Sequence, residues 1–434
     1  MKKLFLMGFV ALAFASCVSD KEVTPLTQEQ KYEAAFEELV GGQINASVNW
    51  GFVNVQATAF DADGKYIGMR DANVNGNEWA NYMEVPAALT ETQKAVVRDW
   101  FQTHPNYEGA SVNWSEFWVE QVYKGGTNPT EACPEAYTAG NGSTGIIGSA
   151  HMDKLTCGTG DEHINNFNYG DNKNWNGFTL MQNSSSECFG YITSESSEQK
   201  DDKYIIVSGD EIDESVAGMY FVGFDFESTG NEPNQQIAAD GYYSDWIVRI
   251  VPGLYKNRQR VMVEDLIATD LSQIDKSDWD FNDAIFDVNF IDAYENNTNV
   301  KYAVITLWAA GGTKSLTIEG KEVHELFGQA TSKMINTNAS NGIDGLTPVI
   351  FRVYLGSTDY SKEYNANLIT VKVGGTVLDA PEGKAPQKIV VSSNTKWMQE
   401  RVIITEGYAK FAEYAKTNAP ADWYKTVTDA SKLY

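Results

Sequence analysis

The sequence predicts a mainly β protein, with a β-sandwich or jelly-roll-like C-terminal domain and a mixed α+β N-terminal domain. Beyond residue 200, short β-branched or aromatic runs recur between Gly, Pro, Asn or Asp residues, a rhythm typical of a sandwich. Helix signals are few, and they concentrate before residue 105 and in the C-terminal tail. At 434 residues the chain is long enough for at least two domains.

The first residues have the pattern of a secretory signal. Two lysines precede the apolar run 4–14, and two small residues stand directly before Cys17, which resembles the lipobox of bacterial lipoproteins. The polar, partly acidic stretch 18–22 resembles the surface-export signals of outer-membrane lipoproteins. We therefore expect residues 1–17 to be a lipoprotein signal peptide and Cys17 to be acylated. The mature protein would then be anchored in the outer membrane, on the cell surface. The alternative is an ordinary secreted protein with a chance cysteine.

Three segments predict helices. Residues 27–40 are rich in helix formers and end at Gly41, so residues 18–42 are expected to be a tether and a short helix. Thr90 and Gln93 form a capping box that predicts a second helix. Residues 408–416 predict a third. The segment 114–123 fits either a helix or a strand, and both alternatives stay open.

The polar stretch 193–202 is the expected domain boundary, which gives an N-terminal domain over 43–198 and a β-rich domain over 199–434. The predicted strands are Tyr204–Val207, Gly218–Phe226, Trp246–Val251, Ala284–Phe290, Tyr302–Trp308, Val349–Tyr354, Leu368–Val373 and Lys388–Val391.

Composition restricts the partners. A formal net charge of −26 argues against nucleic acid and against anionic membrane surfaces. After Cys17 three cysteines remain, so they cannot all pair internally. In an oxidising compartment we expect Cys157 to pair with Cys188, although sequence alone does not fix the connectivity. His151 and His163 flank Cys157, but no spacing typical of a zinc site accompanies them.

The most informative segment is Asp278–Val288, in which acidic and amide side chains crowd together directly before and within a predicted strand. Oxygen-only ligands suit calcium far better than zinc or copper. The expected ligands are Asp278, Asp280, Asn282, Asp283 and Asp287, with Glu264 and Asp265 from the preceding segment. On an extended backbone, side chains spaced by two would share one face. The segment is no EF-hand, which would need Gly at position six and Glu at position twelve. The alternative is a solvated turn whose side chains cap backbone amides.

These residues resemble the signature of LruC-domain lipoproteins of Gram-negative bacteria. The resemblance rests on the following segments: 49–52, 151–153, 263–266, 277–283, 311–312, 320–328, 335–337, 397, 400–401, 408 and 411. It implies an outer-membrane or surface-exposed lipoprotein with a β-rich domain and no established catalytic residues.

No catalytic constellation stands out, since the chain has four histidines, no nucleophile elbow and no phosphate-binding loop. The pattern around His324 fits a surface turn or strand edge better than a metal site. The 53 aromatic residues keep a glycan or protein ligand open. The leading hypothesis is a calcium-stabilised surface binding or adhesion module without catalysis. A structural or assembly component of the envelope is the second, and a glycan-acting hydrolase is the third.

Overall fold

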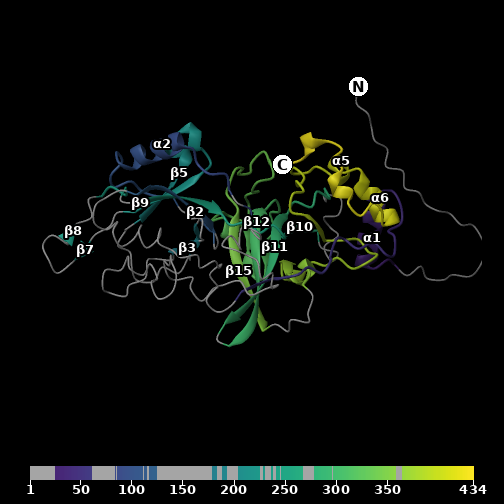
Figure 1. Ribbon diagram of the computed structural model, residues 1–434. Helices are drawn as coiled ribbons and strands as arrows, with labels where there is room; N and C mark the ends of the chain where they lie inside the picture. The colour runs from purple at the N-terminus through teal and green to yellow at the C-terminus, as the bar shows by residue number, and fades with distance from the viewer. Residues whose placement is uncertain are drawn as a thin grey trace, which may run out of the picture.

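The computed structural model describes residues 25–60, 84, 86–110, 112–114, 117–124, 178–182, 188–192, 204–224, 228–229, 236–237, 241–244, 246–266, 278–295, 297–357 and 364–434. Within these residues the chain is mainly β, as the sequence predicts, with two six-stranded sheets, one four-stranded sheet and one two-stranded hairpin. Figure 1 shows β11, β12 and β15 in the middle, with α1, α5 and α6 on one side and the sheet that carries β2, β5 and β9 on the other.

The central sheet belongs mostly to the C-terminal half. In spatial order its strands are β15 (Val349–Ser357), β12 (Thr298–Ala309), β11 (Ala284–Glu295), β10 (Gln259–Val263) and β18 (Lys388–Ser392). A further strand, β1 (Thr58–Phe60), runs parallel to β11 beyond the end of β10. The side chains predicted to point inward from β11 are all buried in the main core: Ala284, Phe286, Val288 and Phe290. The intervening residues Ile285, Asp287 and Asn289 are buried as well, so burial does not alternate along this strand.

A smaller sheet shares the same core. Its strands, in spatial order, are β14 (Lys321–Glu322), β13 (Leu316–Ile318), β16 (Val371–Val373) and β17 (Thr376–Val377). Leu316 and Ile318 of β13 and the two valines of β16 lie in the core that β11 also lines. Two antiparallel sheets thus enclose one core in a sandwich-like arrangement.

The second six-stranded sheet joins the two halves of the sequence. Its strands, in spatial order, are β3 (Phe178–Gln182), β4 (Cys188–Ile192), β2 (Phe117–Lys124), β9 (Trp246–Pro252), β6 (Tyr220–Phe224) and β5 (Tyr204–Ser208). The open alternative at residues 114–123 resolves to strand β2. The predicted boundary between 198 and 199 is wrong, because strands from both sides of it pair in this sheet.

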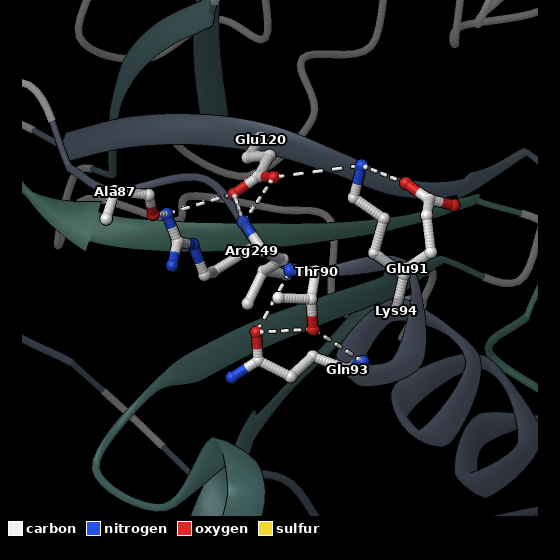
Figure 2. Close-up of polar contacts among 8 residues, drawn as sticks. Ala87, Thr90, Glu91, Gln93, Lys94, Glu120 and Arg249 are labelled. Carbon is white, nitrogen blue, oxygen red and sulfur yellow. Dashed lines mark hydrogen bonds and ion pairs between the residues drawn. The ribbon is translucent and has the colours of Figure 1, made fainter.

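Helix α2 (Glu91–Phe101) covers this sheet and buries Val97 and Phe101 in its core. Figure 2 shows the polar contacts that hold the N-terminal end of α2 against the sheet. Glu120 of β2 accepts a hydrogen bond of 2.9 Å from the Leu89 amide and forms an ion pair of 2.9 Å with Arg249 of β9. The predicted capping box between Thr90 and Gln93 is present.

Helices α1 (Gln28–Val40), α5 (Ile404–Gly407) and α6 (Lys410–Thr417) lie together beside the central sheet (Figure 1). The first of them ends as predicted, at Gly41 in the left-handed conformation, and Thr27 caps its start. Its residues Tyr32, Phe36 and Val40 are buried in the main core. The helix predicted for residues 27–40 is therefore confirmed, but it is part of the C-terminal domain and not of a separate tether.

The remaining elements are short: the hairpin of β7 (Ser228–Thr229) and β8 (Gln236–Ile237), helix α4 (Val323–Leu326), and 3-10 turns at Gly209–Glu211, Glu214–Val216, Ala366–Leu368, Trp423–Lys425 and Ala430–Lys432. Each predicted strand contains strand residues, although Leu368–Val373 begins as a 3-10 turn.

Candidate functional site

The acidic segment 278–283 leads directly into β11 with an unusual backbone. Trp279 and Phe281 have φ angles of 51° and 53°, in the left-handed region that bulky residues rarely adopt. The prediction of an extended backbone here is therefore wrong. Such strain persists only where the surroundings over-determine it, and it is found most often at binding and active sites.

The two aromatic residues of the segment hold it against the core. The Trp279 ring packs 5.3 Å from Tyr32 and 5.5 Å from Phe36 of α1, centroid to centroid. The Phe281 ring packs 5.9 Å from Phe411 of α6. Both side chains are nearly or fully buried. The alternation of acidic and aromatic residues thus has a structural cause, since the rings fix the backbone that carries the carboxylates.

Five of the predicted ligands come together beside this anchor. They form two triads that share one member: Glu264, Asp265 and Asp283 in one, and Glu264, Asp278 and Asp280 in the other. Within each triad, one ligand oxygen from every residue lies within 4.8 Å of the others. Calcium binds oxygens at about 2.3–2.6 Å, so such a set fits around one ion. We call these five residues the acidic cluster.

Asp287 is not part of the acidic cluster, and its prediction as a ligand is wrong. Its buried carboxylate accepts hydrogen bonds from Arg258 Nε at 2.7 Å, from Arg260 Nε at 2.8 Å and from Trp308 Nε1 at 2.9 Å. Two guanidinium groups already balance its charge. The side-chain alternation of β11 directs it to these partners, away from the segment that precedes the strand.

Asn282 positions the Asp280 carboxylate through its amide nitrogen. Its Nδ2 donates to Asp280 Oδ2 at 2.8 Å and to the carbonyl of Met398 at 3.2 Å. Its Oδ1 lies beside Gly311, where a Cβ atom would approach it to 2.2 Å. Its Oδ1 is buried and has no hydrogen-bond partner among the described residues, so Asn282 stays a predicted ligand.

Three further groups complete the surroundings of the acidic cluster. Lys314 Nζ lies 2.9 Å from Asp265 Oδ1, and the Asp265 amide donates to Asp283 Oδ2 at 2.6 Å. A Cβ at Gly312 would stand 2.9 Å from Asp283 Oδ1, so glycine allows the backbone to pass close to the carboxylates. The third group, Glu400, faces Asp278 and Asp280 from a distant part of the sequence. Sequence reasoning missed Lys314 and Glu400 as parts of a site, since only the fold brings them here.

The electrostatics of the acidic cluster are unfavourable for a site without a cation. Burial raises the pKa of Glu264 well above its usual range, and the neighbouring Asp278 and Asp265 raise it further. Burial, followed by adjacent carboxylates, also raises the pKa of Asp280 and Asp283. Glu264 is 2% exposed, and its Oε2 has no hydrogen-bond partner among the described residues. A buried oxygen of this kind is costly unless a proton or a cation satisfies it.

This repulsion predicts that the stability of the folded protein depends on pH when a chelator keeps calcium away. Burial, followed by the nearby Asp278, raises the pKa of Glu400 from 4.5 to about 7. Because the folded state then holds the proton more tightly, the stabilisation is complete below pH 4.5 and is lost as the pH rises through about 7. We expect the melting temperature in EDTA to fall from about pH 5 to about pH 8. Glu400→Gln should flatten this fall, and a flat wild-type profile would contradict the expectation.

His324 serves the structure around Gly312. It is fully buried, its Nε2 lies 3.0 Å from the Gly312 carbonyl, and its Nδ1 lies 2.9 Å from Glu322 Oε1. The expectation of a surface turn is therefore wrong for His324, whereas Glu322 ends the edge strand β14, as the strand-edge alternative expects. Both ring nitrogens are occupied by local partners, which leaves neither free as a metal ligand.

A cavity of about 510 Å³ lies between the second six-stranded sheet and the segments around α4 and β15. Trp114 and Tyr220 meet there edge to face, with ring centroids 5.5 Å apart. Glu325 and Thr347 add polar groups, and no Lys, Arg or His is among its described lining residues. Its size and its mixed lining suit a small neutral ligand.

Several predicted features lie outside the described residues: the signal peptide, Cys17, Cys133, Cys157, His151 and His163. Cys188 begins β4, but the predicted disulfide has its other cysteine outside the described residues. Among the helices that the structure describes, none combines the length and the apolar character needed to cross a bilayer.

Comparisons with known proteins give little guidance. No protein-family model matches the chain, and no curated protein matches it. The resemblance to LruC-domain lipoproteins therefore has no support from a family model. Among solved structures, the chain is similar to a crystal structure from Bacteroides ovatus described as a "putative lipoprotein". The likeness is distant, with 11% sequence identity and a TM-score of 0.31, and it covers 53% of this chain and 92% of the other.

Proposed function

We propose that this chain is a lipid-anchored cell-envelope protein, exposed on the outer membrane, whose LruC-type domain is a calcium-stabilised binding or adhesion module without catalysis. The observation that carries the proposal is the acidic cluster, in which a buried oxygen of Glu264 has no hydrogen-bond partner among the described residues. A divalent cation would satisfy that oxygen and remove the repulsion among the carboxylates.

The donor atoms favour calcium over other metals. Both triads offer carboxylate oxygens alone, without the thiolate or imidazole that zinc and copper prefer. Magnesium demands near-octahedral geometry at about 2.0–2.1 Å and usually keeps several waters, so it binds through one or two carboxylates. Calcium accepts six to eight oxygens in flexible geometry, which suits several converging carboxylates.

Thermal unfolding of the mature chain in calcium, in magnesium and in EDTA tests this proposal. Binding to the folded state alone stabilises it by about 2.7 kcal/mol at a hundredfold excess of calcium over the dissociation constant. We expect a rise in melting temperature that calcium produces and magnesium does not. Equal melting in all three solutions would reject the calcium site and leave the cluster as a set of protonated, capped side chains.

The anchor is tested separately in cells. Cys17→Ala removes the thiol that lipidation would modify, so we expect the protein to leave the membrane fraction and appear in soluble fractions. A neighbouring change, Ser19→Ala, leaves the cysteine intact and serves as the control. Unchanged membrane fractionation of the Cys17 variant would reject the lipid anchor.

A binding role would use the cavity beside Trp114 and Tyr220. The cavity is lined by the edges of aromatic rings and by one carboxylate, that of Glu325. Its described lining residues include no cation. This lining favours a neutral, hydroxyl-bearing ligand such as a sugar ring. A strongly anionic ligand is disfavoured there and by the charge of the whole chain.

A further inference from the structure

We propose that the acidic cluster binds two calcium ions and that the Glu264 carboxylate bridges them. This inference rests on the proposed function and specifies the number of ions and the role of one residue. Glu264 is the member that both triads share, with Asp265 and Asp283 in one triad and Asp278 and Asp280 in the other.

The geometry favours two ions over one. Oxygens that bind one calcium ion at about 2.3–2.6 Å lie no more than about 5 Å apart, since the largest separation places them on opposite sides of the ion. Each triad meets this limit, with its ligand oxygens within 4.8 Å of one another. The five carboxylates form two such sets around Glu264 and not one set of five. A single ion would therefore leave part of the cluster unbound.

The two triads also have separate supports. Within the first triad, the Asp265 backbone amide donates a hydrogen bond of 2.6 Å to Asp283 Oδ2. Asp280 of the second triad accepts hydrogen bonds from the Arg401 amide at 2.9 Å and from the Asn282 amide at 3.1 Å. Each triad is thus held by its own backbone contacts, as two neighbouring ion positions require.

The charge of the region matches two divalent cations. Six carboxylates face one another here, those of the acidic cluster and Glu400. The cationic groups next to them are Lys314, 2.9 Å from Asp265, and Arg401, 3.7 Å from Glu400. Four negative charges remain, which one calcium ion would only half compensate. Two ions would compensate them fully.

Glu264 has the environment of a bridging ligand. Its carboxylate accepts a hydrogen bond from the Phe281 amide, while Oε2 has no partner among the described residues. The side chain is 2% exposed, so bulk water does not satisfy this oxygen. A carboxylate has enough lone pairs to bind an ion on each side and still accept that hydrogen bond.

The test is the number of calcium ions bound per chain, measured by equilibrium dialysis and elemental analysis of the mature protein in salt that screens weak surface binding. We expect two ions for the wild type. Asp265→Asn and Asp278→Asn should each retain one ion, because each removes a ligand from a different triad. Glu264→Gln should lose both. The matched control, Asp422→Asn, removes an exposed aspartate that belongs to neither triad and should still bind two.

The alternatives give different results. One ion per wild-type chain, with Asp265→Asn and Asp278→Asn both abolishing binding, would establish a single site and overturn the two-ion inference while sparing the proposed function. Two ions in the wild type with one retained by Glu264→Gln would overturn the bridge. No bound calcium in the wild type would overturn the proposed function as well. Because the wild-type count needs no variant, poor folding of one variant leaves the test decisive.

Discussion

Asp287→Ala is expected to destabilise the protein by about 3–5 kcal/mol, because it leaves the buried Arg260 guanidinium without an anion and leaves Arg258 with Glu84 as its remaining anion. Arg258 and Arg260 are 9% and 5% exposed, and both donate to the Asp287 carboxylate. Arg260 also lies over the rings of Trp308 and Trp397, so it cannot turn toward solvent without disturbing the core. A loss of this size is comparable to much of the stability of a typical domain.

Chemical denaturation measures this loss, and Asp422→Ala is its control. Asp422 forms an exposed ion pair with Lys425, and such pairs contribute little. We expect Asp422→Ala to leave the denaturation midpoint unchanged and Asp287→Asn to fall between the two variants. If Asp287→Ala were no more damaging than Asp422→Ala, the buried charge network would not matter to stability.

The double variant Asp280→Asn with Asp283→Asn is expected to lose stability in calcium but not in EDTA. In calcium it should lose the stabilisation that binding provides, about 2.7 kcal/mol at a hundredfold excess over the dissociation constant. In EDTA it should melt at the same temperature as the wild type or higher, because burial and like charge oppose ionisation of both aspartates. Asparagine keeps the size of aspartate and one acceptor oxygen, so position 280 also loses one of the hydrogen bonds that its two oxygens accept.

Thermal unfolding of the double variant in both solutions decides this prediction. Its control is Asp344→Asn, which lies outside the acidic cluster and should preserve the calcium response. A variant that melts lower than the wild type by the same amount in calcium and in EDTA would show that the two aspartates act only through hydrogen bonds.

Local signals in the sequence predicted helices α1, α2 and α6 and eight of the eighteen described strands. The pairs Thr27 with Gln30 and Thr90 with Gln93 form capping boxes that define two helix starts. Strand β10 is absent from the predicted strands, because Arg258 and Arg260 obscure its apolar pattern. Those charges become compatible with burial only when β11 brings Asp287 opposite them. A contact between segments 27 residues apart in sequence is not visible in local periodicity.

The domain boundaries failed for a related reason. A polar stretch indicates a linker only when the chain does not return across it, and here β9 pairs with β2, which precedes the stretch. Helix α1 likewise packs against α6, near the opposite end of the sequence. Pairing between distant segments is decided by tertiary packing, which composition does not record.

Five of the seven predicted ligands converge in the structure. They could be predicted because the crowding of acidic residues beside a strand is visible in the local sequence. Asp287 was included because it belongs to the same crowded segment, although its position within β11 turns it toward Arg258 and Arg260. Glu400 was missed because more than a hundred residues separate it from Asp283. The acidic residues of a site are thus predictable within one segment, whereas their charge partners are not.

Terbium luminescence tests the calcium site most directly, because terbium resembles calcium in size and in its preference for oxygen ligands. Trp279 stands between two residues of the acidic cluster, and an excited tryptophan next to bound terbium transfers energy to it. The account predicts terbium emission on tryptophan excitation that calcium displaces, that Trp279→Phe greatly reduces and that Glu264→Gln abolishes. A wild-type protein without calcium-sensitive emission, or emission that survives both substitutions, would contradict an ion at this site.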